Sequence, residues 1–281
     1  MKSFMDCLSK KYAAFEGRAP MRLEVLADTS HVTRATPIVF VHGAWHAAWC
    51  WENFQPYFAR RGYGSHAVSL RGHGASEGRE GLRWHSAAHD YVADLEQVVE
   101  TLGQPPILVG HSMGGYVVQK YLETHAVAAG VLLASVPVSG LSGFVLRSLR
   151  RHPWAFLKTQ LTMNPWHLVA TPALAQDAFF SANLPAEEVE RHFTRLQPES
   201  FRVVYETLFL NLPRPQQVTT PMLVLAAAND TIFSVAEEQA TARAYGTDAV
   251  VFPDMAHDMM LERGWETVAD RILAWLKERG V

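Results

Sequence analysis

The sequence predicts an α/β fold, a doubly wound and mostly parallel sheet that carries an inserted helical cap. From about residue 37 onward, short apolar runs of mostly Val, Ile and Leu alternate with longer amphipathic segments, as expected for strands covered by helices on both faces. Between residues 138 and 217 this alternation stops, and segments with helical patterns separated by Pro follow one another. Ligands of such sheets bind beyond the carboxyl ends of the strands, so this insertion is predicted to be a lid over that edge.

Six apolar runs are predicted to be the parallel strands, because each is short, branched and apolar on both faces. They are PIVFVHG (37–43), HAVSL (66–70), PPILVGHS (105–112), AGVLLAS (129–135), PMLVLAA (221–227) and DAVVFPD (248–254). The earlier run MRLEVLAD (21–28) is predicted to pair as an edge strand.

Three amphipathic segments of the core are predicted to be helices. Ser234 and Glu237 form a capping-box pattern that opens a helix expected to stop near Gly246. The other two helices carry an apolar stripe at helical spacing. The stripes are Tyr91, Leu95, Val98 and Leu102 in the first, before Gly103, and Val268, Ile272, Trp275 and Leu276 in the second.

The cap is predicted to contain short helices at 141–151, 153–161, 185–197 and 198–210. The chain of 281 residues has room for one large domain or two modest ones. We therefore divide it into a first part of the α/β core at 1–137, the cap at 138–217 and a second part of the core at 218–281.

Composition excludes several classes of protein. With 25 Lys and Arg against 28 Asp and Glu, the chain lacks the basic excess that a nucleic-acid binder needs. Residues 126–146 carry no charge, but their Gly and Pro content predicts a buried strand followed by a loop, so no stable membrane insertion is expected. Two cysteines, Cys7 and Cys50, make no disulfide framework, and the first residues lack the apolar run of a secretory signal. A cytoplasmic setting is expected.

A G-x-S-x-G motif at 110–114 lies between a predicted strand and a predicted helix, which is the context of a nucleophile elbow. A serine on so sharp a turn needs neighbours without side chains, which Gly110, Gly114 and Gly115 provide. The turn lifts the Ser112 hydroxyl above the sheet edge, so Ser112 is predicted to be the nucleophile.

A serine nucleophile needs a base and an acid, which follow it in the order acid and then His in this arrangement. Of the histidines after Ser112, His257 lies in a loop after a predicted strand and before the last helix. Asp230 directly follows the strand PMLVLAA and is the preferred acid. Asp254 and Asp258 lie nearer to His257 in sequence, but we interpret them as loop polarity and helix capping.

Together these residues resemble the α/β-hydrolase superfamily, from about residue 35 to the end of the chain. The segment VHGAWHAAWCW (41–51) resembles its oxyanion segment and is similar to that of the plant methylesterase and hydroxynitrile lyase group. The resemblance implies that the backbone amides of Ala44 and Met113 stabilise the oxyanion. Hydroxynitrile lyases keep a lysine after the catalytic histidine, whereas this chain has Asp258, so cyanide release is not expected.

The resemblance implies an enzyme, a serine hydrolase that cleaves carboxyl esters of small to medium acyl chains through an acyl-enzyme, without a cofactor. Trp45, next to Ala44, is a candidate substrate contact. Two His pairs at a spacing of four lack further metal ligands, so no metal site is predicted. The predicted partner is a small-molecule ester, and the sequence leaves the oligomeric state open.

Three alternatives remain open at the level of sequence. Apolar residues of the cap could admit long acyl chains, as in a lipase or a monoacylglycerol lipase. The same triad could act on a lactone, thioester, amide or carbon–carbon bond, or perform perhydrolysis. A ligand receptor without turnover could also use this fold, although the intact triad disfavours it.

Overall fold

The structure is a computed structural model and describes residues 21–281, so Cys7 lies outside the described residues. Within this part of the chain, seven strands form one sheet in the order β1-β3-β2-β4-β5-β6-β7. The strands are β1 (Glu24–Asp28), β2 (Ile38–Val41), β3 (Ser65–Ser69), β4 (Ile107–His111), β5 (Ala129–Leu133), β6 (Met222–Ala227) and β7 (Ala249–Phe252). All six predicted parallel strands and the predicted edge strand are therefore confirmed.

The register of the sheet places its carboxyl edge where the sequence predicts the site. β1 pairs antiparallel with β3 at one edge, and all other pairings are parallel. β2 lies between β3 and β4, so the chain reverses its direction of winding beside β2. In doubly wound sheets ligands bind at such a switch point, which here lies beyond the ends of β2 and β4.

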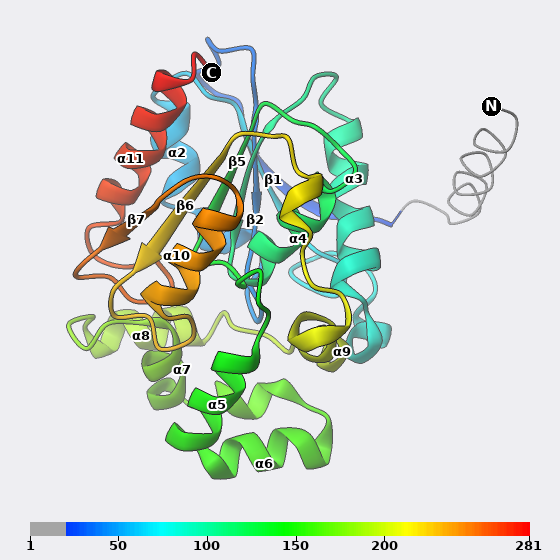
Figure 1. The fold of residues 1–281 in the computed structure, drawn as a ribbon, viewed down its shortest axis with the longest axis vertical. Coiled ribbons are helices and arrows are strands. Elements are labelled where there is room, and N and C mark those ends of the chain that lie inside the picture. Colours follow the sequence, from blue (N-terminus) through cyan, green and yellow to red (C-terminus); the bar gives the residue numbers. More distant parts are fainter. Residues whose placement is uncertain (1–20) are drawn as a thin grey trace, which may run out of the picture.

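Helices cover both faces of the sheet (Figure 1). α2 (Phe54–Ala59) and α11 (Trp265–Glu278) lie together on one face, and α3 (Val92–Glu100) and α4 (Met113–Leu122) lie together on the other. α10 (Val235–Ala244) packs on β6 and β7. Three short helical turns complete this part: η1 (Ala48–Trp51), η2 (Arg79–Trp84) and η3 (Ala87–Tyr91).

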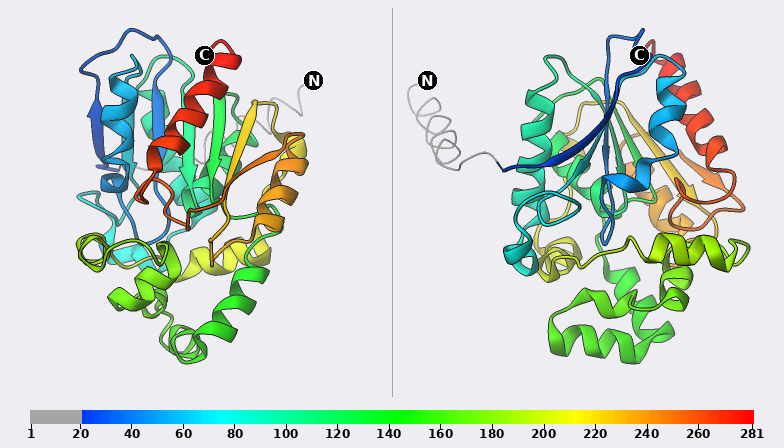
Figure 2. Two further views of the ribbon diagram at one scale, coloured as in Figure 1. Left: turned by 90° about the vertical axis from the view of Figure 1, so that its left-hand side faces the viewer. Right: turned by 180° about the vertical axis from the view of Figure 1, so that it is seen from behind.

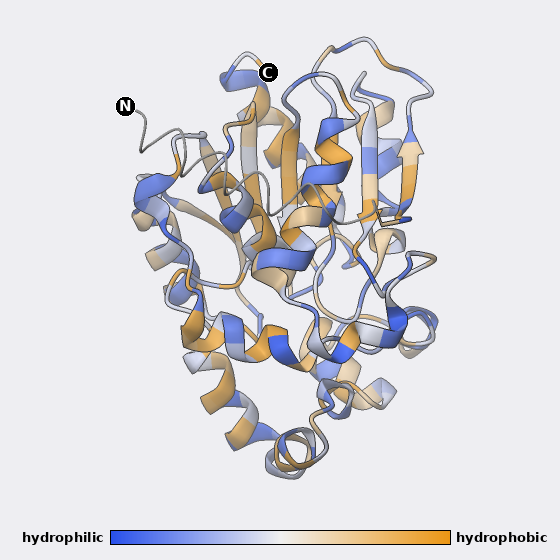
Figure 3. Ribbon diagram, turned by 90° about the vertical axis from the view of Figure 1, so that its right-hand side faces the viewer, coloured by the Kyte–Doolittle hydropathy of each residue, from blue (hydrophilic) through white to orange (hydrophobic). Residues whose placement is uncertain are grey.

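Local sequence signals account for these helices. The side chain of Ser234 accepts from the backbone of Glu237, whose side chain accepts in return from the backbone of Ser234, so the predicted capping box opens α10. The apolar stripe of α11 is buried throughout. Figure 3 shows the same rule across the fold, with hydrophobic strands in the interior and helices that alternate between polar and apolar faces.

Between β5 and β6 the chain forms helices and no strand. The segment 138–217 contains α5 (Ser142–Arg151), α6 (Pro153–Thr162), α7 (Pro172–Phe179), α8 (Ala186–Phe193) and α9 (Phe201–Tyr205). Short turns η4 (Pro165–Leu168), η5 (Glu206–Leu210) and η6 (Pro215–Gln217) lie among them. α5 to α8 lie beneath the sheet in all three ribbon views (Figures 1 and 2). α7 is not among the helices predicted from the sequence.

Hydrogen bonds join α7 to the loops that follow β6 and β7. Thr231 donates to the carbonyl of Asp177 over 2.7 Å, and the amide of Asp258 donates to the carbonyl of Phe179 over 2.9 Å. The helical segment therefore contacts the carboxyl edge of the sheet, where the candidate site lies.

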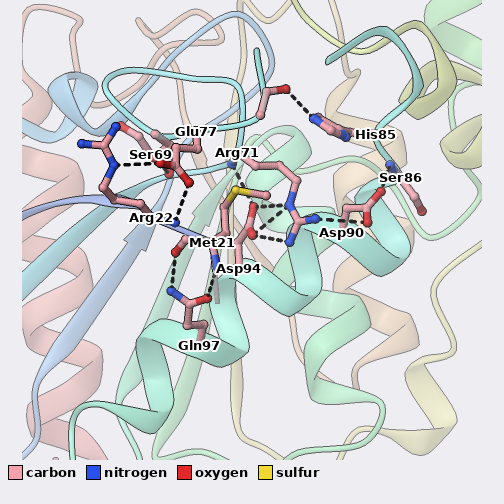
Figure 4. A network of polar contacts seen from close by, with 12 residues as sticks. Met21, Arg22, Ser69, Arg71, Glu77, His85, Ser86, Asp90, Asp94 and Gln97 are labelled. Atoms are coloured by element: carbon pink, nitrogen blue, oxygen red, sulfur yellow. Dashed lines mark hydrogen bonds and ion pairs between the residues drawn. The ribbon is translucent and has the colours of Figure 1, made fainter. Parts of the chain in front are cut away.

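A buried ion pair fixes the loop after β3 to α3. Nη2 of Arg71 lies 2.6 Å from Oδ1 of Asp94, whose side chain is fully buried, and the backbone amide of Arg71 donates to the same carboxylate (Figure 4).

Residues 126–146, the uncharged stretch of the sequence, contain β5, the loop after it and the start of α5. No helix among residues 21–281 is both long and apolar enough to span a membrane.

Candidate active site

Ser112 lies between the end of β4 and the start of α4 and has the strained backbone of an elbow. Its φ of 51° and ψ of −118° are unusual for a residue with a side chain. Its amide donates to the carbonyl of Leu133 over 3.0 Å, which fixes the turn to the neighbouring strand. A Cβ atom on Gly114 would lie 2.3 Å from the carbonyl oxygen of Val41. Only glycine therefore lets α4 approach β2 so closely.

Asp230 and His257 meet directly at the carboxyl ends of β6 and β7. Nδ1 of His257 lies 2.8 Å from Oδ2 of Asp230, and each side chain is 1% exposed. The amides of Ile232 and Phe233 donate to Oδ1 of Asp230 over 2.7 and 3.0 Å, which holds the carboxylate in place. A carboxylate only accepts, so Nδ1 of His257 carries the hydrogen and Nε2 is left as the basic nitrogen.

The elbow lies against the loop that carries His257. The ring of His111, next to Ser112, lies 4.8 Å from the ring of His257, centroid to centroid, and its Nε2 donates to the carbonyl of His257 over 3.0 Å. Among the described residues, Ser112 makes no side-chain hydrogen bond to His257. Such contacts are often loose without a substrate and tighten in the complex.

The oxyanion segment after β2 passes close to the elbow. A Cβ atom on Gly43 would lie 2.7 Å from Nδ1 of His111 and 3.0 Å from Cβ of Ser112. Ala44 is the next residue, and Met113 is the first residue of α4, where amides lack an acceptor within the helix. The backbone of both predicted donor residues therefore lies next to Ser112.

His42 holds the start of this segment and is not a base. Its Nε2 accepts from the amide of Leu70 over 3.0 Å, and its Nδ1 donates to the carbonyl of Gly43 over 2.8 Å. Burial, and then the neighbouring His73, keeps the pKa of His42 well below its usual value. His42 is therefore a neutral anchor between the ends of β2 and β3.

Trp45 has a positive φ of 65° and its side chain is 7% exposed. Its ring lies 5.7 Å from that of Phe179 on α7, and it lines a small pocket with Phe144, Thr231 and Ile232 among others. A larger pocket of about 620 Å³ opens beside it, between α7 and the residues flanking Asp230. Neither of these two pockets of the described chain is lined by Ser112 or His257.

The interpretation of Asp258 as loop polarity or a helix cap is wrong. Its side chain is fully buried, and its Oδ2 lies 2.9 Å from Nε2 of His46. Its Oδ1 lies 3.5 Å from Nε2 of His111. His46 and Asp258 are 212 residues apart, so no local pattern in the sequence marks them as partners.

Nitrogen and oxygen atoms of His111, His257 and Asp258 lie within 4.8 Å of one another and could in principle hold a metal ion. However, Nδ1 of His257 already donates to Asp230, and the Asp258 carboxylate already accepts from His46. Nε2 of His111 donates to a backbone carbonyl, so that nitrogen cannot also be a ligand, and Nδ1 of His111 has no hydrogen-bond partner among the described residues. We therefore assign the contacts of this cluster with Asp230, His46 and the backbone carbonyl to hydrogen bonding.

Residues 38–271 of this chain are matched by a family model described as alpha/beta hydrolase family. The chain belongs to the alpha/beta hydrolase family. The resemblance and the fold class that the sequence indicated are thus confirmed. Within the family, the chain is 28% identical to the pFDCC methylesterase MES16 of Arabidopsis thaliana over 209 residues, 69% of this chain and 77% of that protein.

Solved structures of alpha/beta hydrolases have the same fold. An esterase from Thermogutta terrifontis superposes with a TM-score of 0.70 at 20% identity, over 94% of this chain and 97% of the esterase. A monoacylglycerol lipase from Paleococcus ferrophilus gives 0.67 at 19% identity, over 92% of this chain and 100% of the lipase. At such identities the likeness supports the fold, and the reaction must be argued from the site.

Proposed function

We propose that this alpha/beta hydrolase is a serine hydrolase that cleaves carboxyl esters of small to medium acyl chains. The observation that carries the proposal is the 2.8 Å hydrogen bond between His257 and Asp230, formed beside the elbow of Ser112. Esterases and methylesterases among its relatives support the same reaction. The enzyme acts on a small-molecule ester and needs no cofactor for this chemistry.

The reaction proceeds in two halves. Nε2 of His257 accepts the proton of the Ser112 hydroxyl as its oxygen attacks the ester carbonyl, and Asp230 stabilises the imidazolium that forms. The tetrahedral oxyanion collapses to an acyl-serine, and His257 gives its proton to the departing alkoxide. Water then attacks the acyl-serine with His257 as base, and the carboxylic acid leaves as Ser112 regains its proton.

Two backbone amides, those of Ala44 and Met113, stabilise the oxyanion in this proposal. The close approach of Gly43 to Ser112 supports the first, and the position of Met113 at the start of α4 supports the second. Fixed N–H donors that face the developing negative charge stabilise the transition state, and this contribution is usually the largest single one in such reactions. Both donors belong to segments held by hydrogen bonds to neighbouring strands.

The helical segment 138–217 is the cap in this proposal, and residues 1–137 and 218–281 are the two parts of the core. The contacts of α7 with the loops after β6 and β7 support this division. Trp45 and Phe179, whose rings are in contact, would border the acyl group.

We also propose a reducing, cytoplasmic setting, on the ground that the two cysteines make no disulfide framework.

A panel of nitrophenyl esters of increasing acyl length, with lactone, thioester and amide substrates beside them, tests the proposal. Replacing Ser112 with Ala should reduce ester turnover by about 10⁴-fold or more. Ser142→Ala, at an exposed serine at the start of α5, is the matched control and should keep full turnover. Ester turnover by Ser112→Ala at the level of the unchanged chain would contradict the proposal.

A further inference from the structure

A buried pair of charged groups lies beside the proposed catalytic residues and has no role in the reaction as described above. Nε2 of His46 lies 2.9 Å from Oδ2 of Asp258, and both side chains are fully buried. His46 belongs to the segment after β2 and Asp258 directly follows His257, so the pair joins two segments that both contribute to the site.

The contacts of His46 require that it carry a positive charge. Its Nε2 faces the Asp258 carboxylate and its Nδ1 lies 2.8 Å from the carbonyl oxygen of Ala44. A carbonyl and an ionised carboxylate only accept hydrogen bonds, so with Asp258 ionised both nitrogens of His46 donate, and an imidazole with two N–H groups is an imidazolium.

Electrostatics agree with this assignment. Burial alone would lower the pKa of His46, but the negative charge and hydrogen bond of Asp258, with the carbonyl of Ala44, raise it above its usual value. Burial alone would raise the pKa of Asp258, but the charge of His46 and its hydrogen bond lower it. The pair is therefore an imidazolium bound to a carboxylate, with no net charge.

The pair belongs to a network that joins four segments, which are the oxyanion segment, the elbow, the histidine loop and α7. Through His46 it holds the carbonyl of Ala44, and through the amide of Asp258 it holds the carbonyl of Phe179 on α7 over 2.9 Å. Oδ1 of Asp258 also lies 3.5 Å from Nε2 of His111, which donates to the carbonyl of His257. The oxyanion segment, the elbow and the histidine loop thus share one buried network.

We propose that His46 and Asp258 are a positioning pair that fixes the oxyanion segment against the loop of the catalytic histidine. This inference rests on the proposed function, because it assigns the pair to the geometry of that reaction. Neither residue touches the reacting atoms. The pair holds the Ala44 turn and the His257 loop at a fixed separation, so that the oxyanion donor and the base act on the same substrate.

Two variants remove the pair with little change of shape. Asp258→Asn keeps an acceptor for Nε2 of His46 but removes the charge that keeps both nitrogens protonated. His46→Gln keeps one donor toward Asp258 but loses the bond to Ala44. Glu123→Gln is the matched control, since it breaks the largely buried ion pair of Lys120 and Glu123, 2.7 Å apart, at the far end of α4, about 15 Å along the helix from Ser112.

The readout separates positioning from stability. Turnover is measured per active serine, counted with a fluorophosphonate, well below the melting temperature of each variant. We expect kcat of Asp258→Asn and His46→Gln to fall about 10²-fold, the scale of a lost oxyanion donor, with KM changed less than about threefold. Affinity for a boronic acid analogue of the substrate, which mimics the tetrahedral intermediate, should fall by the same factor as kcat.

Nitrogen-15 chemical shifts of the histidine rings at pH 7 give a second readout that needs no activity. Both nitrogens of His46 should be protonated in the unchanged chain, and one should lose its proton in Asp258→Asn. Unchanged kcat and boronate affinity in both variants, or a neutral His46 in the unchanged chain, would overturn the positioning pair. Ester turnover that does not depend on Ser112 would instead overturn the proposed function, so the two failures are distinguishable.

Discussion

Nδ1 of His257 donates to Oδ2 of Asp230 across 2.8 Å, and the other oxygen of Asp230 accepts from the amides of Ile232 and Phe233. The carboxylate is thus held by its own loop and leaves one oxygen for the histidine. This relationship fixes which nitrogen of His257 is basic, and the first prediction follows from it.

Replacing Asp230 with Asn should reduce kcat by about 10⁴-fold, the cost of holding the catalytic imidazole in the wrong tautomer. The fold should survive, because the Asn oxygen still accepts from the two amides. Steady-state ester kinetics measure this effect. Asp254→Asn is the control, since Asp254 lies exposed in the same loop as His257, and it should keep turnover within about twofold. A larger loss of kcat in Asp254→Asn than in Asp230→Asn would show that the assignment of Asp230 as the acid is wrong.

Gly43→Ala should impair turnover more than stability. The added Cβ would meet Nδ1 of His111 at 2.7 Å and Cβ of Ser112 at 3.0 Å, so the oxyanion segment must move away from the elbow. We expect kcat to fall about 10²- to 10³-fold. Gly103→Ala is the control, because its Cβ would lie in open space but at a φ of 69°. It should lower stability by about 1 kcal/mol and leave kcat unchanged. Equal kcat in both variants would contradict the oxyanion assignment.

Phe179→Ala should widen the acyl site. Phe179 is 1% exposed, and its ring lies 6.2 Å from that of His257 and 5.7 Å from that of Trp45. Its removal should cost about 3–5 kcal/mol of stability and raise kcat/KM for long acyl chains relative to short ones about tenfold. Phe201→Ala removes another buried ring of the cap, on α9, and should cost stability without changing that ratio. An unchanged ratio of kcat/KM for long and short acyl chains in Phe179→Ala would show that Phe179 does not border the acyl group.

Glu238→Gln should stabilise the protein at pH 8 but not at pH 4. Burial, and then the charges of Asp230 and Glu237, raise the pKa of Glu238 well above its usual value. Between pH about 4.3, where the unfolded chain ionises this group, and the raised pKa of the folded chain, only the folded chain keeps it neutral, so stability falls as pH rises. Glutamine never ionises and avoids the loss.

Thermal unfolding at the two pH values measures this difference. The melting temperature of Glu238→Gln at pH 8 should exceed that of the unchanged chain by about 2 °C or more. Glu190→Gln, at an exposed position of α8, should show no such dependence on pH. A lower melting temperature of Glu238→Gln at pH 8 would mean that the folded chain holds Glu238 ionised.

Features that depend on neighbours along the chain were predictable from the sequence. The strands, the capping box of α10 and the Gly-rich turn around Ser112 are of this kind, and the structure has them where the sequence indicates. α7 was also within reach, because Thr171 caps its start and Pro172 occupies its first turn. Its short apolar sequence carries no clear stripe, and it was missed.

Features that depend on distant segments were not predictable. His46 and Asp258 meet only because β2 and β7 end at the same edge of one sheet, and their 212-residue separation hides the contact from any local pattern. The position of Asp230 after β6 was predictable because a rule of strand order applies to it. No comparable rule pairs a histidine of the oxyanion segment with the residue after His257.

The most direct test of the proposed reaction is to find which residue is acylated or phosphonylated during turnover. The protein is titrated with a fluorophosphonate while ester hydrolysis is followed, and the label is located by mass spectrometry of peptides. We expect one label per chain, on Ser112, and loss of hydrolysis in proportion to labelling. A label on another residue, or full hydrolysis after complete labelling of Ser112, would contradict it.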